Sequence, residues 1–170
     1  RSRHLVVPYP EAIRDDLDKK NLPEVQRKLT ALPPYALADP KVKTYVAILW
    51  NNLGLEQERM SGTKASVQSF KQAATLDTAN PTIQLNLAHA YWELRDPALN
   101  QDFLTTLIAV APNEPFPHLA MADLLHEQDR LGEAATHLAQ ATERAGHDPR
   151  VQSYLAAVTA KLRQTEAAES

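Results

Sequence analysis

The stretch Trp50-Asn51-Asn52-Leu53-Gly54 decides the fold, because it ends in a large aliphatic residue followed by a very small one and that pair recurs. At steps of 34 residues the same pair returns as Leu87-Ala88, Met121-Ala122 and Leu155-Ala156. Prolines keep the same step, at Pro81, Pro115 and Pro149. A fixed period of about 20 to 50 residues is typical of stacked structural repeats. The sequence therefore predicts a repeat protein.

Composition favours one helical unit. The chain has 170 residues, of which 44% are hydrophobic and only 6% aromatic. Twelve prolines against four glycines indicate turns that depend more on proline at helix starts than on glycine at helix ends. The chain has no cysteine, which excludes disulfides and thiolate metal sites and leaves the compartment open.

Charge gives no reason to expect nucleic acid as a partner. The net charge is −3, and nucleic-acid capture needs a strongly basic face. The charge is uneven, since residues 1–80 carry 12 Lys/Arg against 9 Asp/Glu and residues 81–170 carry 6 against 12. This asymmetry either orients a partner or drives head-to-tail contacts, or it is simply an uneven solvated surface. No apolar run approaches the roughly 20 residues of a membrane span, so direct membrane insertion is not expected.

The 3.6-residue recurrence of apolar residues and its punctuation predict helical hairpins. In the second copy a helix begins at Pro81, and Asp96-Pro97 ends it and opens a second helix that closes before Pro112. In the third copy the helices begin at Pro115 and after Asp129. A last helix begins at Pro149, and two further helices are expected over residues 10–20 and 23–32.

These residues carry a family resemblance, because Trp50-Asn51-Asn52-Leu53-Gly54 is similar to the W-x-x-L-G core of the tetratricopeptide repeat (TPR). Other parts of the TPR pattern are spread over the copies, at Phe70, Tyr91, Pro112 and Ala134. The departures are Gln57 in place of an aromatic residue, and Asn100 and Leu107 in place of small ones. The resemblance implies an all-α fold, an α-solenoid of antiparallel helical hairpins in a TPR-like superhelix, with about nine helices.

The register predicts three TPR-like repeats over residues 47–148, namely 47–80, 81–114 and 115–148. Residues 1–46 form an N-terminal arm and a degenerate helical hairpin that caps the array, and residues 149–170 form a C-terminal capping helix and tail. The first helix of the first repeat extends back to about residue 40, so we expect it to be about two turns longer than its counterparts. Its free end either contacts a partner or a second copy or is covered by residues 10–32, and we favour the second interpretation.

The sequence contains few residues arranged for catalysis or metal binding. Asp15, Asp16 and Asp18 are adjacent but point in different directions on a helix, so they do not form a calcium loop. None of the six histidines pairs with another at the i, i+4 spacing of a helical zinc site, and the four glycines are isolated. No strained turn presents a nucleophile. The sequence therefore predicts no enzymatic activity, no metal and no cofactor.

The resemblance implies where a partner binds, because in TPR arrays the first helices of successive hairpins line a concave groove. The matching positions are Asn51, Leu55 and Glu58 in the first copy, Leu85, His89 and Trp92 in the second, and Leu119, Asp123, His126 and Glu127 in the third. This mixed surface favours a protein or peptide partner with a few apolar side chains and some basic character. Trp92 is either the main anchor or packs beneath a neighbouring hairpin.

One subclass of the family is not expected. TPR domains that clamp the acidic C-terminus of heat-shock chaperones share lysines, an arginine and asparagines in this groove. The matching residues are Asn51, Leu55, Asn86, Phe116 and Ala120, and only Asn86 fits.

The predicted function is a non-catalytic scaffold that binds a peptide or helix of a partner protein in the concave groove. Two alternatives remain: a TPR region of a larger enzyme or membrane-anchored assembly factor, and a self-assembly module that forms a homo-oligomer. The first gains from Arg1 at the start, because we expect a processed product or a piece of a longer protein. The second gains from the arm at residues 1–10, whose apolar side chains could lie in a neighbouring groove. We also expect the weakest repeat interface at Asn100, where replacement by alanine should stabilise the array if the site is buried.

Overall fold

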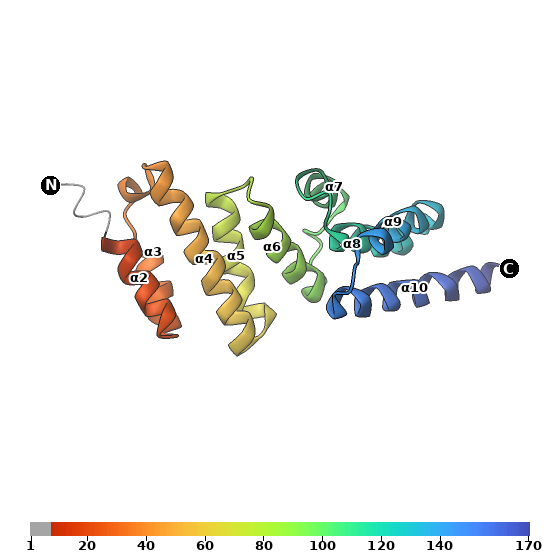
Figure 1. The fold of residues 1–170 in the computed structure, drawn as a ribbon, viewed down its shortest axis with the longest axis horizontal. Helices are drawn as coiled ribbons and strands as arrows, with labels where there is room; N and C mark the ends of the chain where they lie inside the picture. Colours follow the sequence, from red (N-terminus) through yellow and green to blue (C-terminus); the bar gives the residue numbers. More distant parts are fainter. Residues whose placement is uncertain (1–7) are drawn as a thin grey trace. The chain divides into compact units, whose positions relative to one another are not determined.

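A computed structural model describes residues 8–170, and this part of the chain contains nine α-helices, one 3-10 turn and no β-strand (Figure 1). The elements in order are α2 (Pro8–Asp18), α3 (Leu22–Thr30), η1 (Pro34–Leu37), α4 (Pro40–Ser61), α5 (Thr63–Leu76), α6 (Pro81–Leu94), α7 (Gln101–Val110), α8 (Pro115–Glu127), α9 (Leu131–Arg144) and α10 (Pro149–Glu169). The all-α fold class is confirmed. The side chains of the N-terminal arm, from which self-assembly was expected, lie outside the described residues.

The chain divides into two compact units, which we call unit 1, up to Asp96, and unit 2, from Pro97 to Ser170. The division falls between α6 and α7, inside the second copy of the sequence repeat. Unit 1 contains α2 to α6 and unit 2 contains α7 to α10.

In unit 1, α4 and α5 form a hairpin (Figure 1), and Gly54 of α4 lies against Phe70 of α5. Phe70 of α5 is fully buried, and a Cβ at residue 54 would lie 2.6 Å from its Cε1. Real Cβ atoms do not approach another atom so closely, so a larger residue at 54 would force the Phe70 ring or the helices to shift. The small residue of the repeating pair therefore lies where the helices of the hairpin meet.

Helices α2 and α3 pack on α4. Ile13 and Val25 have no exposed surface, and the Lys20 Nζ lies 3.0 Å from the Glu56 Oε1. These contacts place α2 and α3 against α4, while the expectation that residues 10–32 cover the free end of this helix stays a prediction. With 22 residues α4 is longer than α6 and α8, which have 14 and 13, as the sequence predicts.

The turns of the array explain how the chain manages with few glycines. Helices α4, α6 and α8 each begin with a proline, and Asp39 and Asn80 cap the first two by accepting backbone N–H groups. At the other end, α2, α6 and α8 are followed by left-handed residues that are not glycine, namely Lys20, Arg95 and Asp129, with φ of 60°, 52° and 59°. Proline starts and left-handed polar residues thus replace glycine stops at these turns.

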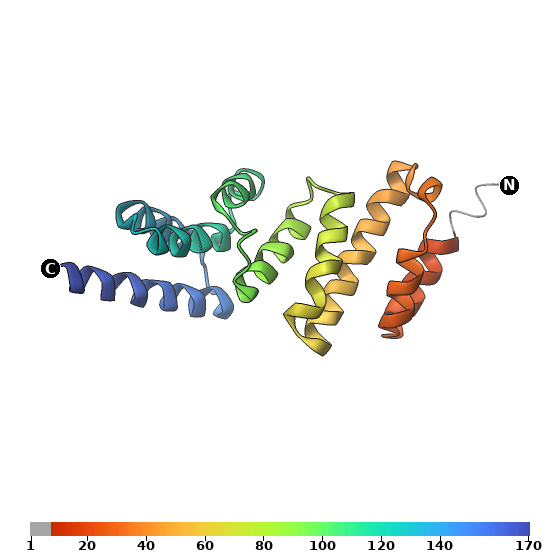
Figure 2. The same ribbon diagram turned by 180° about the vertical axis from the view of Figure 1, so that it is seen from behind.

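In unit 2, helix α8 is central, with α7, α9 and α10 packed around it (Figure 2). Every residue from Pro115 to Asp123 is buried, and so is Leu125. A helix with apolar residues on all sides is stable only when it is surrounded, which explains why the sequence shows no single apolar stripe here.

Helix α7 corrects the sequence analysis. It begins at Gln101, so the prediction that Asp96-Pro97 opens this helix is wrong by one turn. Asn100 is exposed, and its Oδ1 accepts a hydrogen bond of 2.9 Å from the backbone N of Phe103. Asn100 is therefore the N-cap of α7, and the expectation that its amide is buried is wrong.

Candidate protein-interaction site

The residues predicted to line a groove lie on α4, α6 and α8, spaced by three or four positions on each helix. Such spacing places the members of each set on one side of their helix. Helices α4 and α6 belong to unit 1, and α8 belongs to unit 2.

In unit 1 a pair of amides joins α4 to α6. Asn86 Nδ2 donates to Asn51 Oδ1 at 2.8 Å, and Asn51 Nδ2 donates to Asn52 Oδ1 at 3.3 Å. Asn51 is buried, so this hydrogen bond satisfies polar atoms that would otherwise be costly. Among the predicted groove residues, Asn51 thus has a structural contact that fixes the two first helices side by side.

Around this amide pair the surface is apolar and accessible. Leu55 is 42% exposed, and Leu85, His89 and Trp92 are partly exposed, as is Glu58 at the edge. Ile48, also 42% exposed, lies three residues before Asn51 on the same side of α4. We call the surface of Ile48, Leu55, Leu85, His89 and Trp92 the α4–α6 face.

The sequence analysis missed Ile48. A signal for it was present, since an isoleucine at the i−3 position from Asn51 and the i−7 position from Leu55 continues the same side of the helix.

In unit 2 the predicted third-copy residues are mostly covered. Leu119 has no exposed surface, and Asp123 forms an ion pair with Lys161 of α10. The His126 Nε2 lies 2.6 Å from the Thr165 Oγ1, also on α10. Of this set only Glu127 is exposed. The sequence analysis took α10 for a cap and did not predict that it covers these positions.

A second cluster in unit 2 was also missed. His118 of α8 and His137 of α9 stack with ring centroids 5.3 Å apart and an angle of 29° between the planes, and their Nδ1 atoms are 3.0 Å apart. One neutral ring can donate to the other at this distance. His118 stands 68 residues after Trp50, two periods along, so a histidine in the place of the repeat's tryptophan was a readable signal.

Burial sets the protonation of this pair. Burial lowers the pKa of His118 to about 4, and the positive charges of Arg144 and His137 act in the same direction. Burial also lowers the pKa of His137, while Glu133 opposes the shift. Both rings are therefore neutral at pH 7, and the pair holds α8 to α9 without a net charge.

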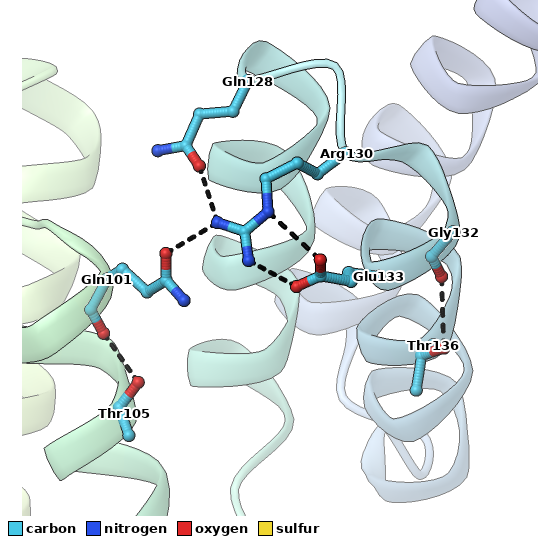
Figure 3. Close-up of polar contacts among 7 residues, drawn as sticks. All are labelled: Gln101, Thr105, Gln128, Arg130, Gly132, Glu133 and Thr136. Carbon is cyan, nitrogen blue, oxygen red and sulfur yellow. Dashed lines mark hydrogen bonds and ion pairs between the residues drawn. The ribbon is translucent and has the colours of Figure 1, made fainter.

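An exposed cluster ties the turn between α8 and α9 to the start of α7 (Figure 3). Arg130 Nη1 donates to Gln101 Oε1 at 2.9 Å and to Gln128 Oε1 at 3.0 Å. Arg130 Nε and Nη2 donate to the two carboxylate oxygens of Glu133 at 3.2 and 2.5 Å. The Arg130 guanidinium therefore donates to side chains of the same unit, and this cluster stabilises the fold.

Within residues 8–170 no three potential metal-ligating side chains come together, and no helix in that range has the length and apolar character needed to cross a membrane.

The stacked hairpins define an α-helical repeat protein. No family model matches the sequence, and no curated protein is similar to it in sequence. Solved structures do match. MamA (AMB-1) has a TM-score of 0.60 at 14% identity over 98% of this chain and 87% of its own. The TPR domain of Arabidopsis OM64 has a TM-score of 0.59 at 17% identity over 72% and 98%.

A third similar structure is the first TPR of Spaghetti (RPAP3) bound to the HSP90 peptide SRMEEVD. Its TM-score is 0.53 at 15% identity, over 69% of this chain and 95% of its own. The likeness in all three cases is one of fold. The chain has the tetratricopeptide-repeat fold, which confirms the resemblance seen in the sequence.

Proposed function

We propose that this chain is a non-catalytic protein-interaction module that binds a peptide or helix of a partner on the α4–α6 face. The observation that carries the proposal is the exposure of Ile48 and Leu55, each 42%, beside the buried Asn51 and its hydrogen bond to Asn86. Large apolar side chains grouped on a rigid pair of helices are typical of interaction sites, whereas scattered ones are not.

The chemistry of this face suggests the partner. Leu85 and Trp92 add partly exposed apolar area, and an indole contributes much buried area at low cost in side-chain entropy. Glu58 lies on the same side of α4 as Leu55. A partner with two or three apolar side chains and a basic residue therefore suits the α4–α6 face.

An acidic tail such as the HSP90 peptide held by the RPAP3 domain suits it poorly. At the unit 1 positions that would clamp a carboxylate, this chain has the buried Asn51 and the apolar Leu55. The amide of Asn86 donates to Asn51. A terminal carboxylate would therefore lose its hydration without gaining cationic donors at these positions.

The test is affinity capture from a lysate of the source cells, with the wild-type chain beside a Leu55→Ala, Trp92→Ala variant. We expect a protein that the wild type retains and the variant loses. The matched control is Met60→Ala, because Met60 is also an exposed apolar residue of α4, at 55%, and is not part of the α4–α6 face. Circular dichroism verifies that all three chains keep their helicity.

Equal retention by the wild type and the double variant would contradict the proposal and place binding elsewhere on the chain. For a partner that is captured, binding should weaken about thirtyfold or more in the double variant, since hot-spot truncation costs about 2 kcal/mol or more. If the captured protein is the chain itself, the self-assembly alternative is favoured.

A further inference from the structure

Helix α10 lies on α8 in a regular ladder of contacts. The Phe116 and Tyr154 rings meet edge to face at 6.3 Å and 62°, Asp123 pairs with Lys161, and His126 contacts Thr165. The partners are 38, 38 and 39 residues apart, so the two helices run parallel with a nearly constant offset.

This offset is not the one that joins first helices in unit 1. There Asn51 of α4 and Asn86 of α6 are 35 residues apart, close to the repeat period. Helix α10 is thus shifted along α8 by three to four residues, which is one turn or about 5 Å. It lies on the face of α8 without taking the position of a regular next repeat.

Few side chains of α10 are fully buried. Among its described side chains only Val158 and Leu162 are buried, although the helix has 21 residues. The Lys161 side chain is 39% exposed even in its ion pair. By contrast, ten of the thirteen residues of α8 are buried. Helix α10 therefore contributes much less to the core of unit 2 than α8 does.

The surface below α10 has a specific requirement. With α10 in place the Asp123 side chain is 8% exposed, so any helix that covers this carboxylate in the same way must bring a cation to it. Lys161 supplies that cation, and Val158 and Leu162 flank it at i−3 and i+1. The part of unit 2 that precedes α10, residues 97–148, carries 8 Asp/Glu against 2 Lys/Arg, which favours a basic occupant.

We propose that α10 is a displaceable occupant of the surface of α8 formed by Phe116, Asp123 and His126, the α8 face, and that this face binds an amphipathic partner helix that replaces it. The partner runs parallel to α8, with apolar side chains in the places of Val158 and Leu162 and a lysine in the place of Lys161. The inference shares one premise with the proposed function, namely that first helices of the repeat bind partners.

The probe is a fluorescently labelled synthetic peptide of residues 149–169, measured by anisotropy against the full chain. In the wild type, α10 competes from within the chain at an effective concentration on the order of millimolar, so binding of the peptide is weak. In a Lys161→Glu, Leu162→Ser chain, whose own α10 is weakened, we expect the peptide to bind about tenfold more tightly or better. Adding Asp123→Lys should reverse this gain, because the peptide's lysine then faces a lysine and the chain's own α10, which carries Lys161→Glu, regains an opposite charge at residue 123.

The matched control is an Arg163→Glu, Gln164→Ser chain, which makes a similar change on the exposed side of α10 and should bind the peptide as weakly as the wild type. Equal binding to the wild type and to the Lys161→Glu, Leu162→Ser chain, or binding to neither, would overturn the proposal. So would the loss of slow amide exchange over residues 115–144 in that chain, because α10 would then be inseparable from the α8–α9 core. Since only unit 2 is involved, these outcomes leave capture through the α4–α6 face unaffected.

Discussion

The hairpins α4–α5 and α8–α9 have the same architecture and are held together differently. In α4–α5 the helices meet where Gly54 faces Phe70, so the contact depends on shape. In α8–α9 the equivalent small residue is Ala122, and the stacked pair of His118 and His137 adds a titratable contact. The repeat therefore determines how the two helices of a hairpin are spaced, whereas the side chains at their contact differ between hairpins. One hairpin should respond to side-chain volume and the other to pH.

Acidification should strongly destabilise unit 2. The pKa of His118 is about 4 in the folded chain and about 6.5 when unfolded, so below pH 6.5 the unfolded state binds the proton first. The free energy of unfolding of unit 2 therefore keeps the full contribution of His118 above about pH 6.5 and loses it as the pH falls toward 4. Because His118 is 3% exposed, water screens it little, and the difference between a pKa of about 6.5 and one of about 4 corresponds to a loss of about 3 kcal/mol in the free energy of unfolding. Protonation of His137, whose pKa is also lowered, adds to the loss.

The measurement is hydrogen exchange of residues 115–144 between pH 4.5 and 7, after correction for the intrinsic exchange rate. Both tryptophans, Trp50 and Trp92, lie in unit 1, so their fluorescence in denaturant follows that unit separately. A His118→Phe variant should lose most of the pH dependence, whereas His147→Ala, which removes an exposed histidine, should keep it. The same pH dependence in wild type and His118→Phe would contradict the role of the pair.

The second effect tests the dependence on shape. Gly54→Ala places a Cβ 2.6 Å from Phe70 Cε1 and 2.7 Å from its Cδ1. Overpacking of a core costs about 1 to 3 kcal/mol, and the better helix propensity of alanine returns up to about 1 kcal/mol. We expect the free energy of unfolding of unit 1 to fall by about 1 to 2 kcal/mol, measured by tryptophan fluorescence in urea.

Two further variants show whether the lost stability comes from the contact between residue 54 and Phe70. Gly132→Ala is the control, because Gly132 is also helical and its Cβ would meet nothing within 4 Å, so it should stabilise unit 2 slightly. Adding Phe70→Leu to Gly54→Ala should restore part of the lost stability, since in α8–α9 the equivalent residues are Ala122 and Leu138. A Gly54→Ala chain as stable as the wild type would show that the ring of Phe70 moves aside at little cost.

These residues also show what the sequence could predict. The period of 34 residues and the prolines predicted the hairpins, because each reflects a local rule of helix starts and close helix contacts. The pair of His118 and His137 could not be found from spacing within one helix, since its members lie on two. That α10 covers Asp123 depends on a one-turn shift between helices, and no residue pattern within α10 encodes such a shift.

The third effect concerns Asn100, where the sequence and the structure disagree in sign. A buried amide in place of a small residue predicted that Asn100→Ala stabilises the array. Because Asn100 instead caps α7, the change should lower the stability of unit 2 by about 1 kcal/mol. Asn100→Asp keeps an oxygen acceptor for Phe103 N and is the control. Thermal denaturation followed by circular dichroism compares the three chains, and a stabilised Asn100→Ala chain would restore the original interpretation.

The turns of the two hairpins are closed by different residues, and a substitution in one of them should have a small effect on stability. Gly62, with φ of 89°, closes the turn between α4 and α5, whereas Asp129 and the side chain of Arg130 close the turn between α8 and α9 (Figure 3). Arg130→Lys keeps the charge but cannot reach Gln101, Gln128 and both oxygens of Glu133 at once, because an ammonium lacks the planar fork. We expect a loss of about 0.5 kcal/mol in unit 2, measured by hydrogen exchange of α7 and α9, since the cluster is exposed.

Arg59→Lys is the matched control for this change. Arg59 donates to Glu56 at 3.1 and 2.9 Å, and this contact lies within α4, although Glu56 also pairs with Lys20. Its loss should be smaller than that of Arg130→Lys, and in 1 M salt the ion-pair part of both effects should fade. The hydrogen bonds from Arg130 to the two glutamine amides are neutral at the acceptor and should persist. A residual difference between the variants at high salt therefore measures how firmly the start of α7 is held to the α8–α9 turn.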